Sequence, residues 1–291
     1  MLLSISIVNW NTRDDLRRCL ASLPGGAPAT PLEIIVVDNG SRDGTAEMVT
    51  AEFPQVQVIR NTENVGFAHA NNQAIRASQG DYVLLLNPDT VVHPAALDQF
   101  VAAMEAHPRA GIGGAHLLNG DGSLQYSCRR FPSFTAGLFR NSFLGRLFPK
   151  NAMVRDYLMT DFDHASIREV DWVSGAALCI RRATLEQIGP LDETFFMYFE
   201  DVDWCYRAHQ TGWEVRYFPE PRITHLIGKS SDQAIAAMVR AHHHSMLLFY
   251  RKHYNPHTPW LLRWLPPLGI FLRMQLVLRD KRREAARQTT Q

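Results

Sequence analysis

The sequence is poor in cysteine and lacks the short signatures of several common enzyme classes. Its four cysteines, Cys19, Cys128, Cys179 and Cys205, form no C-x-x-C pair, so neither a disulfide framework nor a zinc finger is predicted. No G-x-G-x-x-G follows the first predicted strand and no Walker A pattern occurs, which removes the main support for dinucleotide oxidoreductases and P-loop enzymes. A reducing compartment is the default expectation for such a chain.

A charged leader and a cleavage site are likewise missing at the N-terminus, where the alternation of residues 3–9 predicts a strand. We therefore expect a cytoplasmic location. The 291 residues, 46% of them hydrophobic, can bury a substantial core, which excludes a wholly disordered chain. This length fits one large α/β domain or two smaller domains.

The net charge is only +1, but it is unevenly distributed along the chain. Residues 239–291 hold ten Lys or Arg and only two acidic residues. Such a basic C-terminal part is typical of a segment that meets an anionic surface, either a membrane or nucleic acid.

The first 118 residues alternate β-rich runs with helical patterns, which is typical of βαβ units and a mainly parallel sheet. Strands are predicted at Leu3–Asn9, Leu32–Asp38, Val56–Arg60, Tyr82–Leu86 and Gly111–Leu118. Helices are predicted at Asp14–Leu23, Thr45–Phe53, Ala68–Ser78 and Ala95–Ala106, with capping residues such as Thr12 and Asp43. The uniformly apolar runs at residues 34–37 and 82–86 predict central strands covered on both faces.

From residue 119 to 168 the pattern breaks down, and we expect a long, partly mobile insertion there. Order returns at residues 172–180. The later patterns predict a helix that ends at Gly189-Pro190, a helix over Glu200–Gly212, strands at Glu214–Phe218 and Arg222–Leu226, and a helix over Asp232–Tyr254. We interpret the triplet His242–His244 as ordinary helix surface. The chain thus divides into residues 1–118, residues 119–254 and a tail, residues 255–291.

Polar residues follow three of the predicted strands, at the edge where open α/β sheets bind ligands. The first strand ends at Asn9, the second at Asp38 and the fourth at Asn87-Pro88-Asp89. The carboxylate of Asp38 can accept the imide N–H of a uracil or thymine ring. The alternative is a turn in which Asp38 caps the next helix.

Asp89 follows a buried strand directly and is a candidate ligand for a divalent cation. Mg²⁺ and Mn²⁺ prefer oxygen donors and often share only one or two carboxylates with substrate phosphates. His225 ends a later strand, where its neutral imidazole can bind Mn²⁺, and Lys229 can face phosphate oxygens. The alternatives are a helix-capping aspartate and a buried structural histidine.

The segment from Arg60 to Phe67 leaves the third strand and enters a helix through Gly66. The amides at this entry, together with Arg60, can meet a phosphate or a nucleobase. Simple loop chemistry is the alternative, because Asn and Gly are common turn residues.

Glu200, Asp201 and Asp203 lie at a predicted helix start, directly after the aromatic run at residues 195–199. The helix dipole favours acidic residues there, which explains them without catalysis. Packing against aromatic rings also raises the pKa of a carboxylate toward the range of a general base. We favour the catalytic interpretation, because the strand-end sites occur in the same chain.

Taken in order, these segments resemble family 2 glycosyltransferases of the GT-A fold, particularly the bacterial rhamnosyltransferase-like branch. The resembling segments are residues 6–11, 37–41, 60–72, 86–89, 173–176, 196–203 and 225–230. The resemblance implies an α/β fold with a Rossmann-like, nucleotide-binding mixed sheet flanked by helices. One departure is that many relatives carry Asp-x-Asp where this chain has Asn87-Pro88-Asp89.

The resemblance implies an inverting, metal-dependent transferase with Asp201 as the general base. Asp89 and His225 would be the ligands of Mg²⁺ or Mn²⁺. Donor contacts are implied for Asn9, Asp38, Arg60, Asn64, Gly66, Asn87, Asp89 and Lys229, and acceptor contacts for Trp172, Gly175, Glu200 and Asp203. The rhamnosyltransferase-like pattern points to dTDP-rhamnose as the donor and to a saccharide acceptor in cell-surface polysaccharide synthesis.

Three other interpretations remain open at the level of the sequence. A UDP-sugar, such as a galactofuranose or hexose donor, would serve the same chemistry. A nucleotidyltransferase that activates sugar phosphates also needs metal-binding aspartates, but no basic glycine-rich loop suited to it occurs here. The third is a non-catalytic sugar-nucleotide-binding protein.

Residues 260–278 are rich in Trp, Leu, Phe and Ile, but Arg263, Arg273 and Pro266-Pro267 interrupt them. A spanning helix needs ~20 mostly apolar residues, and charges near its centre are costly. We expect an amphipathic tail on the cytoplasmic face of the inner membrane, with no nucleic-acid partner. A helix that packs on the domain is the alternative. Membrane attachment would suit a lipid-linked saccharide acceptor.

Overall fold

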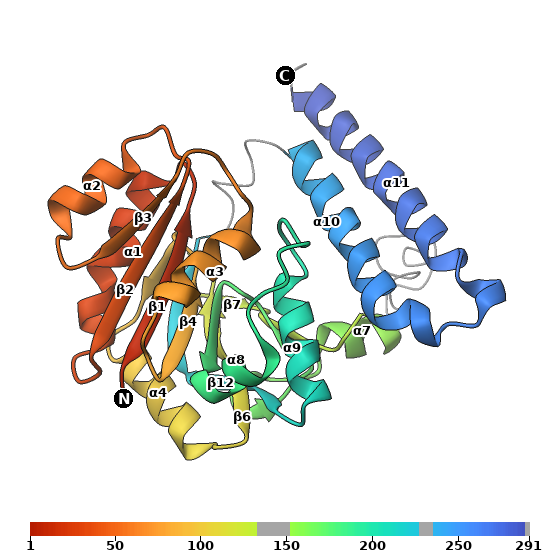
Figure 1. Cartoon of the computed structure of the whole chain (residues 1–291). Coiled ribbons are helices and arrows are strands. Elements are labelled where there is room, and N and C mark those ends of the chain that lie inside the picture. Colours follow the sequence, from red (N-terminus) through yellow and green to blue (C-terminus); the bar gives the residue numbers. More distant parts are fainter. Residues whose placement is uncertain (133–151, 227–234, 289–291) are drawn as a thin grey trace.

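The centre of the protein is a mixed ten-stranded sheet, seen in a computed structural model that describes residues 1–132, 152–226 and 235–288 (Figure 1). Its main path runs β3-β2-β1-β4-β11-β6-β12-β5, and β7 and β9 pair with β6 and β12. The strands are β1 (Leu3–Asn9), β2 (Leu32–Asn39), β3 (Gln57–Asn61), β4 (Tyr82–Leu86), β5 (Thr90–Val92), β6 (Ala110–Leu118), β7 (Leu124–Gln125), β9 (Arg168–Glu169), β11 (Ala177–Arg181) and β12 (Glu214–His225). A separate pair joins β8 (Cys128–Arg129) to β10 (Trp172–Val173).

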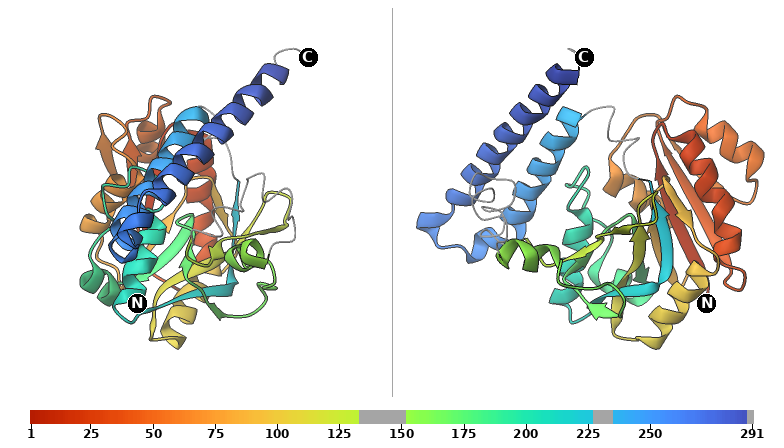
Figure 2. Two further views of the ribbon diagram at one scale, coloured as in Figure 1. Left: turned by 90° about the vertical axis from the view of Figure 1, so that its right-hand side faces the viewer. Right: turned by 180° about the vertical axis from the view of Figure 1, so that it is seen from behind.

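Helices cover both faces of the sheet (Figures 1 and 2). The helices beside it are α1 (Arg13–Gly26), α2 (Thr45–Glu52), α3 (Phe67–Ala77), α4 (Ala96–Ala106), α8 (Arg182–Ile188) and α9 (Glu200–Gln210), whereas α7 (Ala152–Leu158) contacts β8 of the separate strand pair. Leu84 of β4 packs in the core formed with α1 and α4, whereas its neighbours Val83 and Leu85 pack in the core formed with α3, α8 and α9. The uniformly apolar strand is therefore buried on both faces, as predicted.

The α/β class and the elements up to residue 118 are confirmed to within three residues at each end, apart from the unpredicted β5. The two predicted strands at residues 214–226 are in fact one strand, β12, whose register against β6 shifts between Tyr217 and Arg222. Two prolines at 219 and 221 lie in that shift, where they cannot donate to the ladder, so the strand bulges and then continues. The two parts of the predicted division share one sheet, and the boundaries at 118 and 254 stay predictions.

Thr12 occupies the N-cap position of α1 as predicted, but its side chain makes no capping hydrogen bond. The Thr12 hydroxyl donates to Asn9 Oδ1, and the first turn of α1 is capped instead by Asp43, whose Oδ2 accepts the backbone N–H of Arg13 at 2.9 Å. Asp43 also accepts the backbone N–H of Thr45 at the start of α2. One carboxylate therefore holds the entrances of two helices together.

Beyond β12 the chain forms a helical pair that stands beside the sheet (Figure 2). The pair consists of α10 (Ile235–Phe249) and α11 (Leu265–Gln288), joined through η2 (Tyr250–Tyr254), η3 (Asn255–His257) and η4 (Trp260–Leu262). The helix predicted over Asp232–Tyr254 is confirmed from Ile235, because α10 continues into the π-helical turn η2 that ends at Tyr254, and residues 232–234 lie outside the described part. Pro266 and Pro267 do not interrupt α11, because they occupy its first turn, where no intrahelical donor is needed.

Within the described residues, one segment, Trp260–Lys281, is long and apolar enough to cross a membrane, and it is mostly exposed. The interpretation of His242–His244 as ordinary surface is wrong for His243, which is 4% exposed. Its Nδ1–H donates to Val239 O, because a carbonyl oxygen can only accept. All four cysteines are free and buried, and burial raises the pKa of the Cys19, Cys128 and Cys179 thiols to about 12.

Gly114 in the central strand β6 lets Val173 pack directly on the sheet. A Cβ atom at Gly114 would lie 2.5 Å from Val173 Cγ1, which is closer than carbon atoms approach. We expect Gly114→Ala to lower the free energy of unfolding by about 1–3 kcal/mol in urea denaturation, because a buried side chain must move. Gly25→Ala is the matched control, because a Cβ there meets open space. Equal stability of the two variants would contradict this packing.

Candidate active site at the edge of the sheet

The first two strands end in polar residues that hold the loops around the sheet edge. Asn9 of β1 and Asp38 of β2 are register partners, and both are buried. Asn9 Nδ2 donates to Thr45 Oγ1 at 3.0 Å, and Asp38 Oδ1 accepts the backbone N–H of Ser41 at 3.1 Å. Asn9, with no exposed surface, therefore supports the site from beneath, whereas Asp38 keeps one carboxylate oxygen for another partner.

The segment that follows β3 packs against the aromatic run before α9. Gly66 has a φ of +93°, and a Cβ there would lie 2.7 Å from the ring of Phe196. Asn64 Oδ1 accepts from Asn39 Nδ2 at 2.9 Å and so fixes the loop. Glycine is thus required at 66 by close approach, a role that the sequence did not distinguish from ligand binding.

Arg60 stands opposite Asp38 at the end of β3, but its side chain turns toward α2. Arg60 is exposed and pairs with Glu47 on α2, with 3.0 Å between Nη1 and Oε1. Lys229 lies outside the described residues.

Asn87, Asp89 and His225 meet, although 138 residues separate the first from the last. His225 Nε2 lies 3.2 Å from Asp89 Oδ1 and 3.2 Å from Asn87 Nδ2. The backbone explains the meeting, because β5 pairs with the end of β12 so that His225 stands opposite Thr90, and Leu226 N–H donates to Asp89 O. Asp89 and His225 are both largely buried.

The spacing of Asp89 and His225 fits a shared divalent cation. Two ligands about 2.1 Å from a cation and at right angles to one another lie about 3.0 Å apart, close to the observed separation. Among the described residues no group of three or more His, Cys, Asp and Glu side chains is placed to hold a metal. A cation here would therefore draw its other ligands from substrate phosphates, water or a neutral amide such as Asn87.

A hollow of about 530 Å³ opens beside His225. It is lined by Asp15, Arg18, Asn119, Gly120, Asp121, His225 and Leu226. The Asn119–Asp121 turn and the start of α1 therefore flank the pair formed by Asp89 and His225. No local pattern predicts this meeting, because α1 and residue 119 lie about a hundred positions apart in the chain.

Asp201 lies in the first turn of α9 and is only partly buried. Its Oδ2 accepts the backbone N–H of Gly175 at 2.9 Å, and its Oδ1 accepts that of Val202 at 2.8 Å. Burial raises the pKa of Asp201, while these two N–H donors and the charge of Arg129 oppose the rise. A carboxylate with a raised pKa, held at both oxygens, is suited to accept a proton.

The backbone before α9 is strained. Tyr198 and Phe199 have φ values of +68° and +69°, in the left-handed region that costs about 1–2 kcal/mol for residues with a Cβ. Phe199 is the N-cap of α9, and its carbonyl accepts the N–H of Asp203. Such strain persists where the surroundings impose it and is common at functional sites.

Glu200 and Trp172, two expected acceptor contacts, are buried. Glu200 is 5% exposed, its Oε2 has no hydrogen-bond partner, and burial together with the neighbouring charge of Asp201 raises its pKa well above the ordinary value. Trp172 donates its indole N–H to Arg130 O, and Arg129 stacks over its ring. Arg129, which the sequence did not single out, is half-buried, and its guanidinium lies over Trp172 while its charge acts on Asp201.

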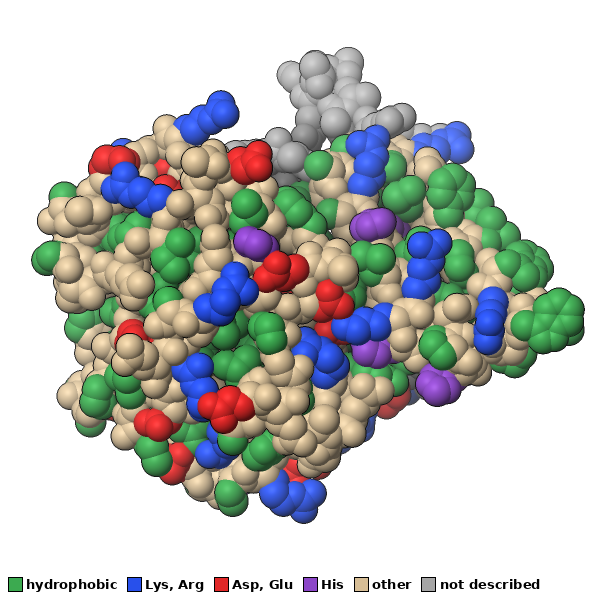
Figure 3. Space-filling model, viewed as in Figure 1, with side chains coloured by type: hydrophobic (Ala, Val, Ile, Leu, Met, Phe, Trp, Pro, Cys, Tyr) green, Lys and Arg blue, Asp and Glu red, His purple; other side chains and the backbone are tan. Residues whose placement is uncertain are grey.

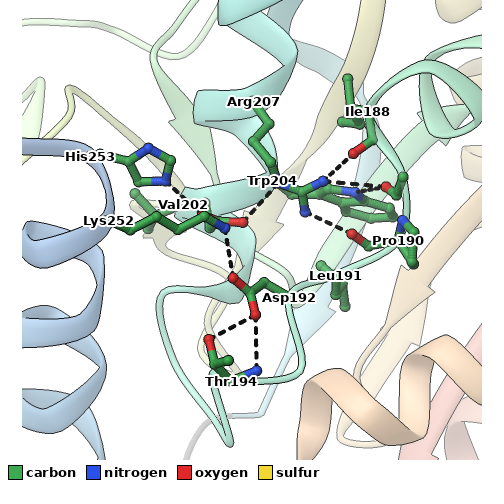
Figure 4. A network of polar contacts seen from close by, with 12 residues as sticks. Ile188, Pro190, Leu191, Asp192, Thr194, Val202, Trp204, Arg207, Lys252 and His253 are labelled. Carbon is green, nitrogen blue, oxygen red and sulfur yellow. Dashed lines mark hydrogen bonds and ion pairs between the residues drawn. The ribbon is translucent and has the colours of Figure 1, made fainter.

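Asp203 does not face the site. It has no exposed surface, and its carboxylate is held by Arg207 at 2.8 Å, Lys252 at 2.7 Å and His253 at 2.7 Å (Figure 4). Burial alone would raise the pKa of Asp203, but these three groups lower it below the ordinary value. The acceptor contact expected for Asp203 does not fit this environment. Lys252 also binds Asp192, so the network ties η2 both to α9, through Asp203, and to the loop that precedes α9.

Comparison with known sequences gives a family and two informative relatives. The profile of the family described as glycosyl transferase family 2 matches residues 4–166. The chain is 32% identical to the N-acetylglucosaminyl-diphospho-decaprenol L-rhamnosyltransferase of Mycobacterium tuberculosis (strain CDC 1551 / Oshkosh), over 98% of the chain and 96% of the relative. It is 26% identical to rhamnosyltransferase WbbL of Escherichia coli (strain K12), over 90% of the chain and 91% of the relative.

Solved structures share the GT-A fold. A mannosyltransferase from Pyrobaculum calidifontis, in complex with GDP-Man and Mn²⁺, matches with a TM-score of 0.58 and 17% identity, over 94% of this chain and 70% of that one. S. aureus TarS 1-349 with UDP-GlcNAc matches with a TM-score of 0.57 and 15% identity, over 94% and 72%. At these identities the likeness concerns the fold alone.

The ion pairs of Asp203 should contribute measurably to stability. We expect Asp203→Asn to lower the free energy of unfolding at neutral pH by about 3 kcal/mol, because Arg207 and Lys252 lose their buried partner. Since the folded pKa of Asp203 is lowered, its contribution is present above about pH 4 and is lost as the pH falls. Urea denaturation at several pH values measures both effects.

The difference in the free energy of unfolding between wild type and Asp203→Asn should therefore decrease as the pH is lowered. Asp161→Asn, at an exposed position, is the matched control and should change little at any pH. A difference that stays constant down to about pH 2 would contradict the assignment.

Proposed function

The chain belongs to glycosyl transferase family 2, and from this premise we propose that it transfers L-rhamnose from dTDP-rhamnose to a lipid-linked saccharide. The observation that carries the proposal is the 32% identity, over 98% of the chain, to a mycobacterial rhamnosyltransferase whose name specifies a sugar on a polyprenyl diphosphate. The likeness to a second rhamnosyltransferase, over 90% of the chain, supports the same sugar. The reaction would serve cell-surface polysaccharide synthesis.

On the donor side, we assign the nucleobase to Asp38 and the diphosphate to the pair Asp89 and His225. Asp38 has one carboxylate oxygen left to accept the imide N–H of thymine. A divalent cation held by Asp89 and His225 would neutralise charge on the departing nucleoside diphosphate. The imidazole nitrogen favours Mn²⁺ over Mg²⁺, which prefers an all-oxygen environment.

On the acceptor side, we assign the general base to Asp201. Its two oxygens are oriented by Gly175 and Val202, so one remaining lone pair can take the proton of the acceptor hydroxyl during attack on the anomeric carbon. A single in-line displacement inverts the anomeric configuration. The buried Glu200 would not touch the sugar, because it has almost no exposed surface.

A donor panel tests the proposal. The protein is incubated with dTDP-rhamnose, a UDP-hexose, UDP-galactofuranose or GDP-mannose, each with Mn²⁺ and a polyprenyl-diphosphate-linked N-acetylglucosamine, and both the nucleotide released and the acceptor product are measured. We expect transfer with dTDP-rhamnose, and a rate at least about a hundredfold lower for Asp201→Asn. Asp161→Asn is the matched control and should retain the wild-type rate.

The outcomes separate the parts of the proposal. Preferential transfer from a UDP-sugar would replace the rhamnosyl donor but keep the transferase. Near-normal turnover of Asp201→Asn would remove the base assignment.

We further propose that α11 attaches the protein to the cytoplasmic face of the inner membrane. Trp264, Leu268, Phe271, Leu272 and Leu276 recur at helical spacing, and each is at least 43% exposed. Figure 3 shows hydrophobic and basic side chains together at the end of the molecule that α11 and its preceding turns form. An exposed apolar stripe beside basic residues favours a lipid surface with anionic headgroups.

Substitution of this stripe should release the protein from membranes. We expect Trp264→Ser combined with Phe271→Ser to lower co-sedimentation with phosphatidylglycerol-containing vesicles at least about tenfold, because two large apolar side chains leave the interface. Transfer to a water-soluble acceptor should be unchanged, which is the control for folding. Unaltered co-sedimentation would exclude this surface, and resistance of the wild type to carbonate extraction would indicate a spanning helix.

A further inference from the structure

The imidazole of His225 is held from behind by a residue that no part of the reaction scheme uses. His225 Nδ1 lies 2.7 Å from Oε1 of Gln125, on the short strand β7. The other ring nitrogen, Nε2, faces Asp89 and Asn87. The ring therefore has one side toward the candidate metal site and one toward Gln125.

The orientation of the Gln125 amide follows from its other contacts. Its Nε2 lies 3.1 Å from the backbone carbonyl of His225 and 2.9 Å from Oδ1 of Asn119. A backbone carbonyl can only accept a hydrogen bond, so the group facing it must be the NH₂ of the amide. Oε1 is then the atom that faces the imidazole.

Asn119 reinforces this orientation. Its Nδ2 lies 3.3 Å from the carbonyl of Leu124 and 2.9 Å from Ser123 Oγ. Because the Leu124 carbonyl also only accepts, the Asn119 NH₂ points there and its Oδ1 is left to accept from Gln125. Two backbone carbonyls thus determine the direction of the hydrogen bonds that link Asn119, Gln125 and His225.

The consequence concerns the proton of the imidazole. Gln125 Oε1 accepts a hydrogen bond only if His225 Nδ1 carries the hydrogen, and in a neutral imidazole Nε2 then keeps its lone pair. That lone pair faces Asn87 Nδ2, from which it can accept a hydrogen bond, and Asp89 Oδ1, each 3.2 Å away. The lone pairs of a nitrogen and a carboxylate oxygen repel one another unless a proton or a cation lies between them.

We propose that Gln125 is a positioning residue that fixes His225 in the tautomer and ring orientation required of a metal ligand. This inference rests on the proposed function, in which His225 and Asp89 bind the cation. Gln125 acts only through His225, by accepting the Nδ1 hydrogen and by holding the ring plane. Groups that hold a ligand histidine in this way typically change metal affinity about 10- to 100-fold when they are removed.

The test measures binding of Mn²⁺ alone to the purified full-length protein, from the loss of the free Mn²⁺ signal in electron paramagnetic resonance. Gln125→Met keeps a similar shape but removes the acceptor, so we expect Mn²⁺ to bind about 10- to 100-fold more weakly. Pulsed spectra of the bound Mn²⁺ should show coupling to nitrogen in wild type and less of it in Gln125→Met.

A double-mutant cycle with His225→Ala separates positioning from a merely structural role. If Gln125 acts through His225, adding Gln125→Met to His225→Ala should weaken Mn²⁺ binding no further. Losses of affinity that add in full would overturn the proposal, as would wild-type affinity in Gln125→Met. Thermal unfolding without metal shows whether each variant is folded, and Asn119→Ser, which loosens the amide without touching His225, replaces Gln125→Met should that variant unfold.

The cycle also distinguishes this inference from the proposed function. If His225→Ala binds Mn²⁺ as wild type does, the metal assignment itself fails. If His225→Ala is weakened but Gln125→Met is not, only the positioning role fails.

Discussion

The arrangement of the candidate site depends on the antiparallel pairing of β5 with the end of β12. This contact covers only three residue pairs, yet it sets Thr90 opposite His225 and lets Leu226 bond to the backbone of Asp89. Because β12 also pairs with β6, the histidine is carried on the main sheet rather than on a free loop. The side chains of Asp89 and His225 are therefore largely buried. Charge neutralisation is most effective in the low local dielectric of such a site.

A second constraint acts on the other side of the site. Asp201 and Asp203 share the first turn of α9, but they have opposite surroundings. Asp203 is surrounded by Arg207, Lys252 and His253, which hold its charge, whereas Asp201 accepts from backbone N–H groups and feels the more distant charge of Arg129. The pKa of one carboxyl is lowered and that of the other raised, which is how two like groups in one turn take different tasks.

Local patterns predicted most of the sheet but little of how distant segments meet. Strands such as β1 and β4 agree to the residue, because an apolar run bounded by turn residues is a local signal. The three-residue β5 is too short for any periodicity, and the bulge in β12 divides its pattern into two runs that look like separate strands. The proximity of Asn87, Asp89 and His225 was inferred from resemblance alone. Local sequence also does not predict the contact of Asp203 with His253, fifty residues away, or that of His225 with Gln125, a hundred residues away.

In a membrane-bound protein, the ion pairs between η2 and α9 would set the position of Asp201 relative to the helical pair. They join the helical pair to the first turn of α9 by direct contact. If α11 lies in the lipid surface as proposed, Asp201 stands at a fixed height above the bilayer. Acceptors whose terminal hydroxyl projects to that height would then be favoured over shorter or longer glycans that carry the same terminal sugar.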